Sequence, residues 1–245
     1  MKFTNYESIK IILIGAGGSG GYEAPHLYRI AYASGKDVRI IIADGDIVEE
    51  DNLIRQNFVA ADVGQNKARV MAERYANVFG IETEYIPRFI EDKDELMRLI
   101  KPDYYGYYYR QNQLVVLIGA VDNNRSRQLC NEVFNKADNL IYIDSGNGEY
   151  TGQVVCGVRK KGRTVMKPVA RWYPDILRTE DKFPTEMSCA ERSVHAPQSI
   201  AANLFASTIV TTLLYQLLIT NEIKLRKTTF SSMSCNVKSV KSGRG

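Results

Sequence analysis

The sequence lacks the cysteine pattern of a disulfide-bonded or zinc-bound domain. Its four cysteines lie far apart along 245 residues and form no C-x-x-C pair. Neither a disulfide framework nor a zinc site is therefore expected, and reduced thiols are the simpler interpretation. The cysteines are Cys130, Cys156, Cys189 and Cys235.

An excess of charge of one sign is also lacking. The sequence contains 32 Lys and Arg residues and 28 Asp and Glu residues, which gives a formal net charge of +4. No strong field directs the whole molecule toward nucleic acid, so a nucleic-acid partner is not expected. Residues 1–10 are polar and lack the pattern of a secretory signal, which favours a cytoplasmic protein.

A long uninterrupted apolar run is lacking as well. Residues 200–219 come closest, but seven side chains with polar atoms interrupt them between Asn203 and Gln216. This pattern favours a buried helix of a soluble protein over a membrane span, so no membrane partner is expected.

The sequence does contain a regular alternation of apolar strands and helices. Its 44% hydrophobic content over 245 residues suits a single domain spanning 1–245. Strands are expected at 10–14, 38–43, 82–86, 114–118 and 140–144, and helices at 22–33, 66–79, 92–100 and 126–137. This order predicts an α/β, Rossmann-like doubly wound fold with a mostly parallel sheet.

The pattern changes in the last third of the chain. A hairpin-type strand at 151–159 predicts an antiparallel extension of the sheet. A polar crossing segment is expected at about 160–197, a long C-terminal helix at 198–223 and a flexible tail at 238–245.

A glycine-rich turn directly follows the first strand. Gly15, Gly17 and Gly20 form G-x-G-x-x-G, with Gly18 inside it, and a helix follows. Such a turn lets backbone N–H groups and a positive helix end approach phosphates, but NAD, FAD and ATP proteins share it. Asp44 ends the second strand, where a carboxylate can bind ribose hydroxyls or simply form a turn.

The stretch that begins at Asp44 indicates which of these nucleotides the protein binds. It reads D-x-D-x-V-x-x-x-N-L-x-R-Q from Asp44 to Gln56, then D-x-G-x-x-K-A from Asp62 to Ala68. An NAD dehydrogenase has no need of Arg55 and Lys67, whereas both motifs resemble those of the ThiF, MoeB and ubiquitin-activating-enzyme superfamily. The similarity continues through D-N-x-x-x-R at 122–127 and a glycine-rich stretch at 144–153, over about two thirds of the chain.

The resemblance implies ATP-dependent adenylation of a carboxylate. By resemblance, the glycines hold the α-phosphate, Asp44 holds the ribose, Arg55 and Lys67 neutralise the β- and γ-phosphates, and Asp122 positions Mg²⁺. The family pattern adds further nucleotide-binding positions at Asp46, Asn52, Gln56, Asn123 and Arg127. From the residues alone, Arg55 could instead form a surface ion pair, Lys67 a solvated helix position and Asp122 a helix cap.

Some members of the superfamily transfer the activated group to a thiol, for which Cys189 is the candidate. Arg192 and His195 would lie near it if the segment were helical, and this would favour the thiolate. A small packed cysteine is the alternative. Cys130 and Cys156 are expected in the core.

The chain departs from the family in two ways: it has no pair of C-x-x-C motifs for zinc, and no arginine precedes the glycine turn. It is otherwise similar to the small ThiF-related proteins of PRTRC-type cassettes. The resemblance implies a homodimer whose substrate is a ubiquitin-like or sulfur-carrier protein, or a peptide. A non-catalytic scaffold and an NAD-dependent oxidoreductase remain alternatives, and the tyrosines at 104–109 suggest a protein-binding loop.

Overall fold

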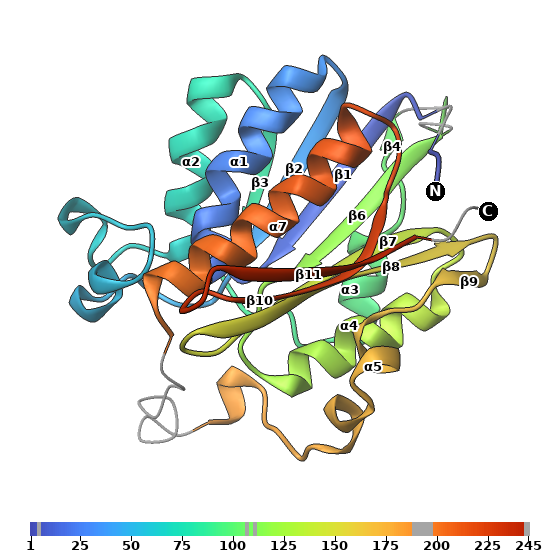
Figure 1. Ribbon diagram of the computed structural model, residues 1–245. Helices are drawn as coiled ribbons and strands as arrows, with labels where there is room; N and C mark the ends of the chain where they lie inside the picture. Colours follow the sequence, from blue (N-terminus) through green and yellow to red (C-terminus); the bar gives the residue numbers. More distant parts are fainter. Residues whose placement is uncertain (4–5, 106–107, 110–111, 188–197, 243–245) are drawn as a thin grey trace.

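The computed structural model describes all residues except 4–5, 106–107, 110–111, 188–197 and 243–245 (Figure 1). Most of the described strands join one sheet in the order β11-β10-β8-β7-β6-β1-β2-β3, with β9 paired to β8. Five strands are parallel: β1 (Ser8–Ile14), β2 (Asp37–Ala43), β3 (Glu82–Ile86), β6 (Gln113–Gly119) and β7 (Leu140–Asn147).

The sheet continues through antiparallel strands beyond β7. These strands are β8 (Thr151–Lys160), β9 (Arg163–Met166), β10 (Leu225–Ser231) and β11 (Asn236–Lys241). A separate hairpin joins β4 (Tyr104–Tyr105) to β5 (Tyr108–Tyr109). The predicted fold class, a mostly parallel doubly wound sheet with an antiparallel extension, is therefore confirmed.

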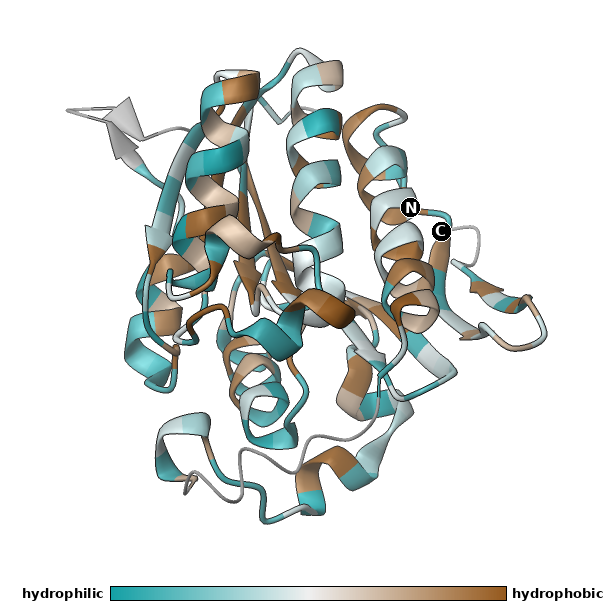
Figure 2. Ribbon diagram, turned by 90° about the vertical axis from the view of Figure 1, so that its left-hand side faces the viewer, coloured by the Kyte–Doolittle hydropathy of each residue, from teal (hydrophilic) through white to brown (hydrophobic). Residues whose placement is uncertain are grey.

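Helices cover both faces of this sheet (Figure 1). One face packs against α1 (Gly18–Ser34), α2 (Lys67–Phe79) and α7 (Ile200–Leu218). The other face packs against α3 (Lys93–Leu99), α4 (Asn124–Lys136) and α5 (Val169–Trp172). The central strands are buried on both faces because both carry helices, and their runs toward the carboxyl ends, residues 11–14 of β1 and 114–118 of β6, are entirely apolar (Figure 2).

Short 3₁₀ helices occupy the longer connections. They are η1 (Glu50–Ile54), η2 (Ala60–Asp62), η3 (Pro174–Arg178) and η4 (Pro184–Glu186). The first two lie between β2 and α2, and the last two lie in the segment that leads toward α7.

Helix α7 is long and apolar enough, by length and composition, to cross a membrane. Half of its most apolar window is buried inside the protein, against α1 and the sheet. It ends at Leu218, earlier than the predicted 223, because Asn221 adopts a left-handed conformation with φ of 51°.

Two further boundaries in the C-terminal part differ from the prediction. Strand β9 occupies the first residues of the crossing segment expected at about 160–197, because it pairs with β8. The tail expected at 238–245 is strand β11 up to Lys241, because its backbone pairs with β10. Strand β10 itself was not anticipated.

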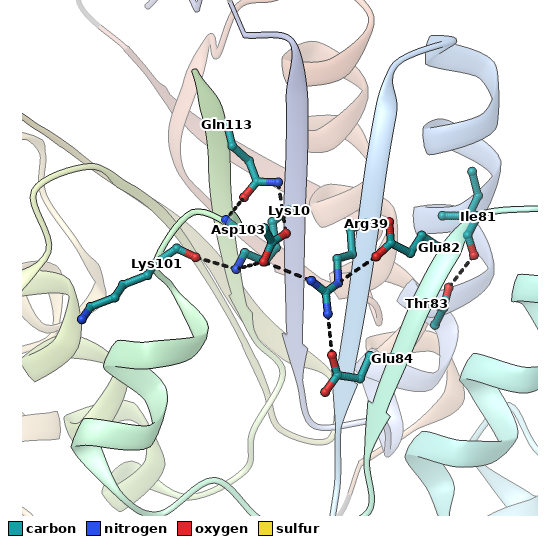
Figure 3. Close-up of polar contacts among 9 residues, drawn as sticks. All are labelled: Lys10, Arg39, Ile81, Glu82, Thr83, Glu84, Lys101, Asp103 and Gln113. Atoms are coloured by element: carbon teal, nitrogen blue, oxygen red, sulfur yellow. Dashed lines mark hydrogen bonds and ion pairs between the residues drawn. The ribbon is translucent and has the colours of Figure 1, made fainter. Parts of the chain in front are cut away.

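A buried charge cluster lies near the amino ends of the strands (Figure 3). Lys10 of β1 is buried, and its ammonium contacts the Asp103 carboxylate at 2.7 Å and the Lys101 carbonyl at 2.5 Å. Arg39 of β2 contacts the same carboxylate at 3.0 Å and reaches Glu84 of β3 at 2.7 Å. These pairs hold the chain that precedes the β4–β5 hairpin against the sheet.

Candidate functional site

The glycine turn lies where β1 meets the start of α1. Gly15 has φ of 92°, which favours glycine, and its N–H donates to the Ala43 carbonyl at 2.9 Å. A Cβ on Gly15 would lie 2.4 Å from the Ala120 carbonyl oxygen, and one on Gly20 would lie 2.0 Å from the Gly15 carbonyl oxygen. Gly15 is therefore required for the close packing of the turn against the end of β6, and Gly20 for the close approach of α1 to the turn.

This turn occupies the switch point of the sheet. From β1 the chain proceeds to β2 and β3 on one side, whereas β6 and β7 lie on the other. Ligands of doubly wound folds bind at such a point, beyond the carboxyl ends of the strands. Within the described part of the chain, no side chain caps the first turn of α1 at Gly17, so its N–H groups and positive dipole end can face an anion.

Asp44 is buried beside the turn. Its carboxylate accepts a hydrogen bond from the Ala16 N–H at 2.6 Å and another from the Asp46 N–H at 2.8 Å. Burial raises the pKa of Asp44 to about 6, Lys67 opposes this rise, and Asp46 adds to it. The two N–H donors thus fix the carboxyl group against the glycine turn, and the same bonds form the local turn that was the alternative interpretation.

Lys67 begins α2 and lies against the same strand end. Its Nζ contacts Asp46 Oδ2 at 3.1 Å, and the side chain is buried rather than solvated. Asn66 caps α2 and donates its amide to the Asp44 carbonyl at 2.9 Å, which ties the helix start to β2. The interpretation of Lys67 as a solvated surface position is therefore wrong.

Arg55 and Gln56 approach the turn from the end of η1. The Gln56 side chain would lie 3.7 Å from a Cβ on Gly17. Arg55 Nη1 donates to Gln198 Oε1 at 3.4 Å, and this oxygen would lie 2.7 Å from a Cβ on Gly18. Arg55 forms no ion pair with any described residue, so the surface ion-pair alternative has no support.

Asn52, another expected position, contacts protein instead. It is buried in η1, and its side-chain oxygen accepts from the Glu49 N–H at 3.1 Å. This bond closes the 3₁₀ turn that leads to Arg55. The structure thus gives Asn52 a role in shaping the loop.

Residues at the start of α7 also cover the glycine turn, although none of the motifs in the sequence includes them. Asn203 is fully buried, accepts from Asn147 at 2.9 Å and donates to the Arg55 carbonyl at 3.1 Å. Its Oδ1 would lie 2.8 Å from a Cβ on Gly18. The signal in the sequence was a pair of polar residues, Gln198 and Asn203, at the start of an apolar helix.

Asp122 lies in the corner between β6 and α4. Asn123 caps α4 by accepting from the Ser126 N–H at 2.8 Å, so the interpretation of Asp122 as the cap is wrong. The Asp122 carboxylate is exposed and has no hydrogen bond or ion pair within the described part of the chain. An exposed carboxylate beside a phosphate site suits Mg²⁺, which usually takes few protein ligands and several oxygens from phosphate and water.

Arg127 holds this corner from within. Its Nη2 donates to the Val121 carbonyl at 2.5 Å, and its Nε lies 3.5 Å from Asp144 Oδ1. Tyr142 donates to the other oxygen of Asp144 at 2.8 Å. Burial raises the pKa of Asp144, and Arg127 opposes the rise. Arg127 thus positions the chain next to Asp122 through protein contacts.

Other expected positions lie outside the described residues or away from the site. Cys189, Arg192 and His195 fall within 188–197, which the structure does not describe. Cys130 and Cys156 are buried in the core as predicted, and burial raises the pKa of each thiol to about 12. The side chains of the tyrosine loop at 104–109 are also outside the description.

A glycine turn at the switch point of a doubly wound sheet, with a buried carboxylate ending the next strand, defines a nucleotide-binding α/β domain. The chain belongs to the ThiF family, whose family model matches residues 3–244. The comparison with curated protein sequences finds no match.

Three solved structures illustrate the similarity in fold. Escherichia coli MccB with ATP is 20% identical with a TM-score of 0.64, over 96% of this chain and 64% of that chain. The microcin C7 biosynthetic enzyme MccB with N-formylated MccA is 18% identical with a TM-score of 0.64, over 96% and 65%. PaaA is 17% identical with a TM-score of 0.64, over 95% and 63%. The chain therefore spans less than two thirds of the length of these relatives, whose similarity establishes the fold.

Proposed function

We propose that this protein binds ATP with Mg²⁺ and adenylates the terminal carboxylate of a ubiquitin-like protein, a sulfur-carrier protein or a peptide. The observation that carries the proposal is that Arg55 lies beside the start of α1 through Gln198, while Lys67 lies beside Asp46 and acts on Asp44, whose carboxylate accepts from the Ala16 N–H in the turn. Membership of the ThiF family and the similarity to MccB solved with ATP and with MccA support it.

The chemistry requires stabilised negative charge more than proton transfer. A substrate carboxylate oxygen attacks the α-phosphorus, the bond to the bridging oxygen breaks, and pyrophosphate leaves with that bonding pair. Negative charge accumulates on the phosphoryl oxygens, where the N–H groups of the turn, Arg55 and Lys67 would offset it. Mg²⁺ held by Asp122 would neutralise further phosphate charge. The carboxylate is already a nucleophile and needs no general base.

A non-catalytic scaffold is the second candidate, because no arginine precedes the glycine turn. Such a scaffold would bind nucleotide or a ubiquitin-like protein without forming the adenylate. The homodimer is part of the proposal through family resemblance. An NAD-dependent oxidoreductase is a weaker candidate, because it gives no role to Arg55 and Lys67 beside the turn.

The test is ATP–pyrophosphate exchange with a panel of small proteins that end in Gly-Gly. We expect carboxylate-dependent exchange that falls by about a hundredfold or more in Arg55→Ala and in Asp122→Ala. Arg98→Ala and Asp94→Ala on the exposed surface of α3 are matched controls that should retain activity. ATP binding without exchange for any acceptor would favour the scaffold, and NAD binding by calorimetry would favour the oxidoreductase.

A further inference from the structure

Charge is distributed unevenly between the two parts of the chain. Residues 151–245 contain fifteen Lys and Arg against six Asp and Glu, whereas residues 1–150 contain seventeen against twenty-two. The antiparallel extension formed by β8 to β11 therefore belongs to the positive part. Such a surface attracts acidic partners.

One row of residues crosses this extension from strand to strand. Gly146 of β7 pairs with Gln153 of β8, Gln153 pairs with Thr229 of β10, and Thr229 pairs with Lys238 of β11. Directly opposite residues of neighbouring strands share a sheet face, so these four positions lie on the same face. The row carries an amide, a hydroxyl and an ammonium in that order.

The inner end of the row lies beside the proposed adenylation site. Gln153 Nε2 would lie 2.8 Å from a Cβ on Gly146, and an Arg127 nitrogen would lie 2.9 Å from the same Cβ. Arg127 in turn donates to the Val121 carbonyl, next to Asp122. The row therefore begins beside Arg127, which holds the corner at Asp122 where the magnesium ion of the proposed function would bind.

The outer end of the row is an available cation. Lys238 is exposed on the edge strand, and its ammonium has no ion pair or hydrogen bond among the described residues. Lys227, in the adjacent row, instead lies over the rings of Trp172 at 5.0 Å and Tyr173 at 4.7 Å. Lys238 is thus the better placed of the two to bind a new carboxylate.

We infer, on the basis of the proposed function, that this row binds the extended carboxyl end of the substrate and that Lys238 selects an acidic side chain in it. Three strand spacings of about 4.8 Å separate Gly146 from Lys238. An extended chain advances about 3.3 Å per residue, so with the terminal residue of the substrate at Gly146, as this inference places it, the selected acidic residue lies about four residues before the terminal one. Gln153 and Thr229 supply hydrogen-bonding groups to the intervening backbone.

The test uses fluorescein-labelled peptides Ala-Ala-Glu-Ala-Ser-Gly-Gly and the same peptide with Gln or Lys in place of Glu. Anisotropy at low salt should show that the unaltered protein binds the Glu peptide about two- to fivefold more tightly than the Gln peptide, and the Lys peptide least. The preference should decrease at high salt because exposed charges are screened.

Variants of the edge strand make the test specific. Lys238→Gln should abolish the preference, and Lys238→Glu should reverse it. Lys241→Glu makes the same charge change at the far end of β11 and should retain the preference.

The possible results separate the two proposals. Equal affinities for the three peptides, no binding of any of them, or an unchanged preference in Lys238→Glu would overturn the inference. Displacement of the Glu peptide by a short oligothymidylate would instead assign the surface to nucleic acid and would also overturn it. Selective binding of the Glu peptide by a protein that never supports pyrophosphate exchange would leave this inference standing and remove the proposed function.

Discussion

Glu23 of α1 is an ionisable group held in the interior behind the glycine turn. It is fully buried, and neither of its carboxyl oxygens has a hydrogen-bond partner among the described residues. Burial raises its pKa to about 8; the nearby Ser145 hydroxyl lowers the pKa, and the Asp144 carboxylate raises it. The folded protein therefore holds Glu23 in its neutral form at pH 7.

This shift makes stability depend on pH with a defined sign. Between the ordinary pKa of 4.5 and the folded value of about 8, the folded state retains a proton that the unfolded state has released. The contribution of Glu23 to the free energy of unfolding is thus present below pH 4.5 and lost as pH rises toward 8. At about 1.4 kcal/mol per pKa unit, the loss is of the order of 5 kcal/mol.

Glu23→Gln keeps the shape of the side chain and removes its ionisation. We expect the free energy of unfolding of this variant, relative to the unaltered protein, to increase steadily from pH about 5 to pH about 8. The contribution of Asp44, whose pKa is also raised, is common to both proteins and cancels in the difference. Urea unfolding followed by circular dichroism at several pH values measures it.

Glu7→Gln is the matched control, because Glu7 is exposed near the start of β1. The difference in free energy of unfolding between Glu7→Gln and the unaltered protein should remain small from pH about 5 to pH about 8. A difference between Glu23→Gln and the unaltered protein that stays constant across this pH range would refute the assignment of a neutral buried Glu23.

Three further substitutions have definite expected outcomes. Gly20→Ala places a Cβ 2.0 Å from a backbone oxygen and should lower the midpoint of thermal unfolding and abolish ATP binding, whereas Gly148→Ala, with open space around it, should do neither. Asp103→Ala leaves the Lys10 ammonium buried without its carboxylate and should cost about 3–5 kcal/mol in urea unfolding; a loss below about 1 kcal/mol would contradict this. Asn123→Ala removes a helix cap and should cost about 1 kcal/mol, and no loss would show that another group caps α4.

Much of the fold could be predicted because the apolar strands are buried on both faces and bounded by turn residues. The antiparallel end was harder to predict. Strand β10 buries only Thr228 and Phe230, both on one face. Strand β11 is exposed throughout, so β11 is a strand because its backbone pairs with β10. Backbone pairing between segments leaves little trace in the hydrophobic pattern of an edge strand.

The candidate site likewise contains some residues that the sequence predicted and others that it did not. The glycine spacing after the first strand and the position of Asp44 at the end of the second strand indicated the turn and its carboxylate, whereas Arg55 and Lys67 were expected from the family resemblance. The contribution of Gln198 and Asn203 could not be predicted from local sequence, because it depends on the packing of α7 across the turn.

The most direct measurement is a crystal structure of the protein with Mg²⁺ and a non-hydrolysable ATP analogue. We expect phosphate oxygens on the N–H groups at the start of α1, with Arg55 and Lys67 nitrogens within hydrogen-bond distance of the triphosphate. A triphosphate bound elsewhere, or Arg55 and Lys67 directed away from it, would contradict the account.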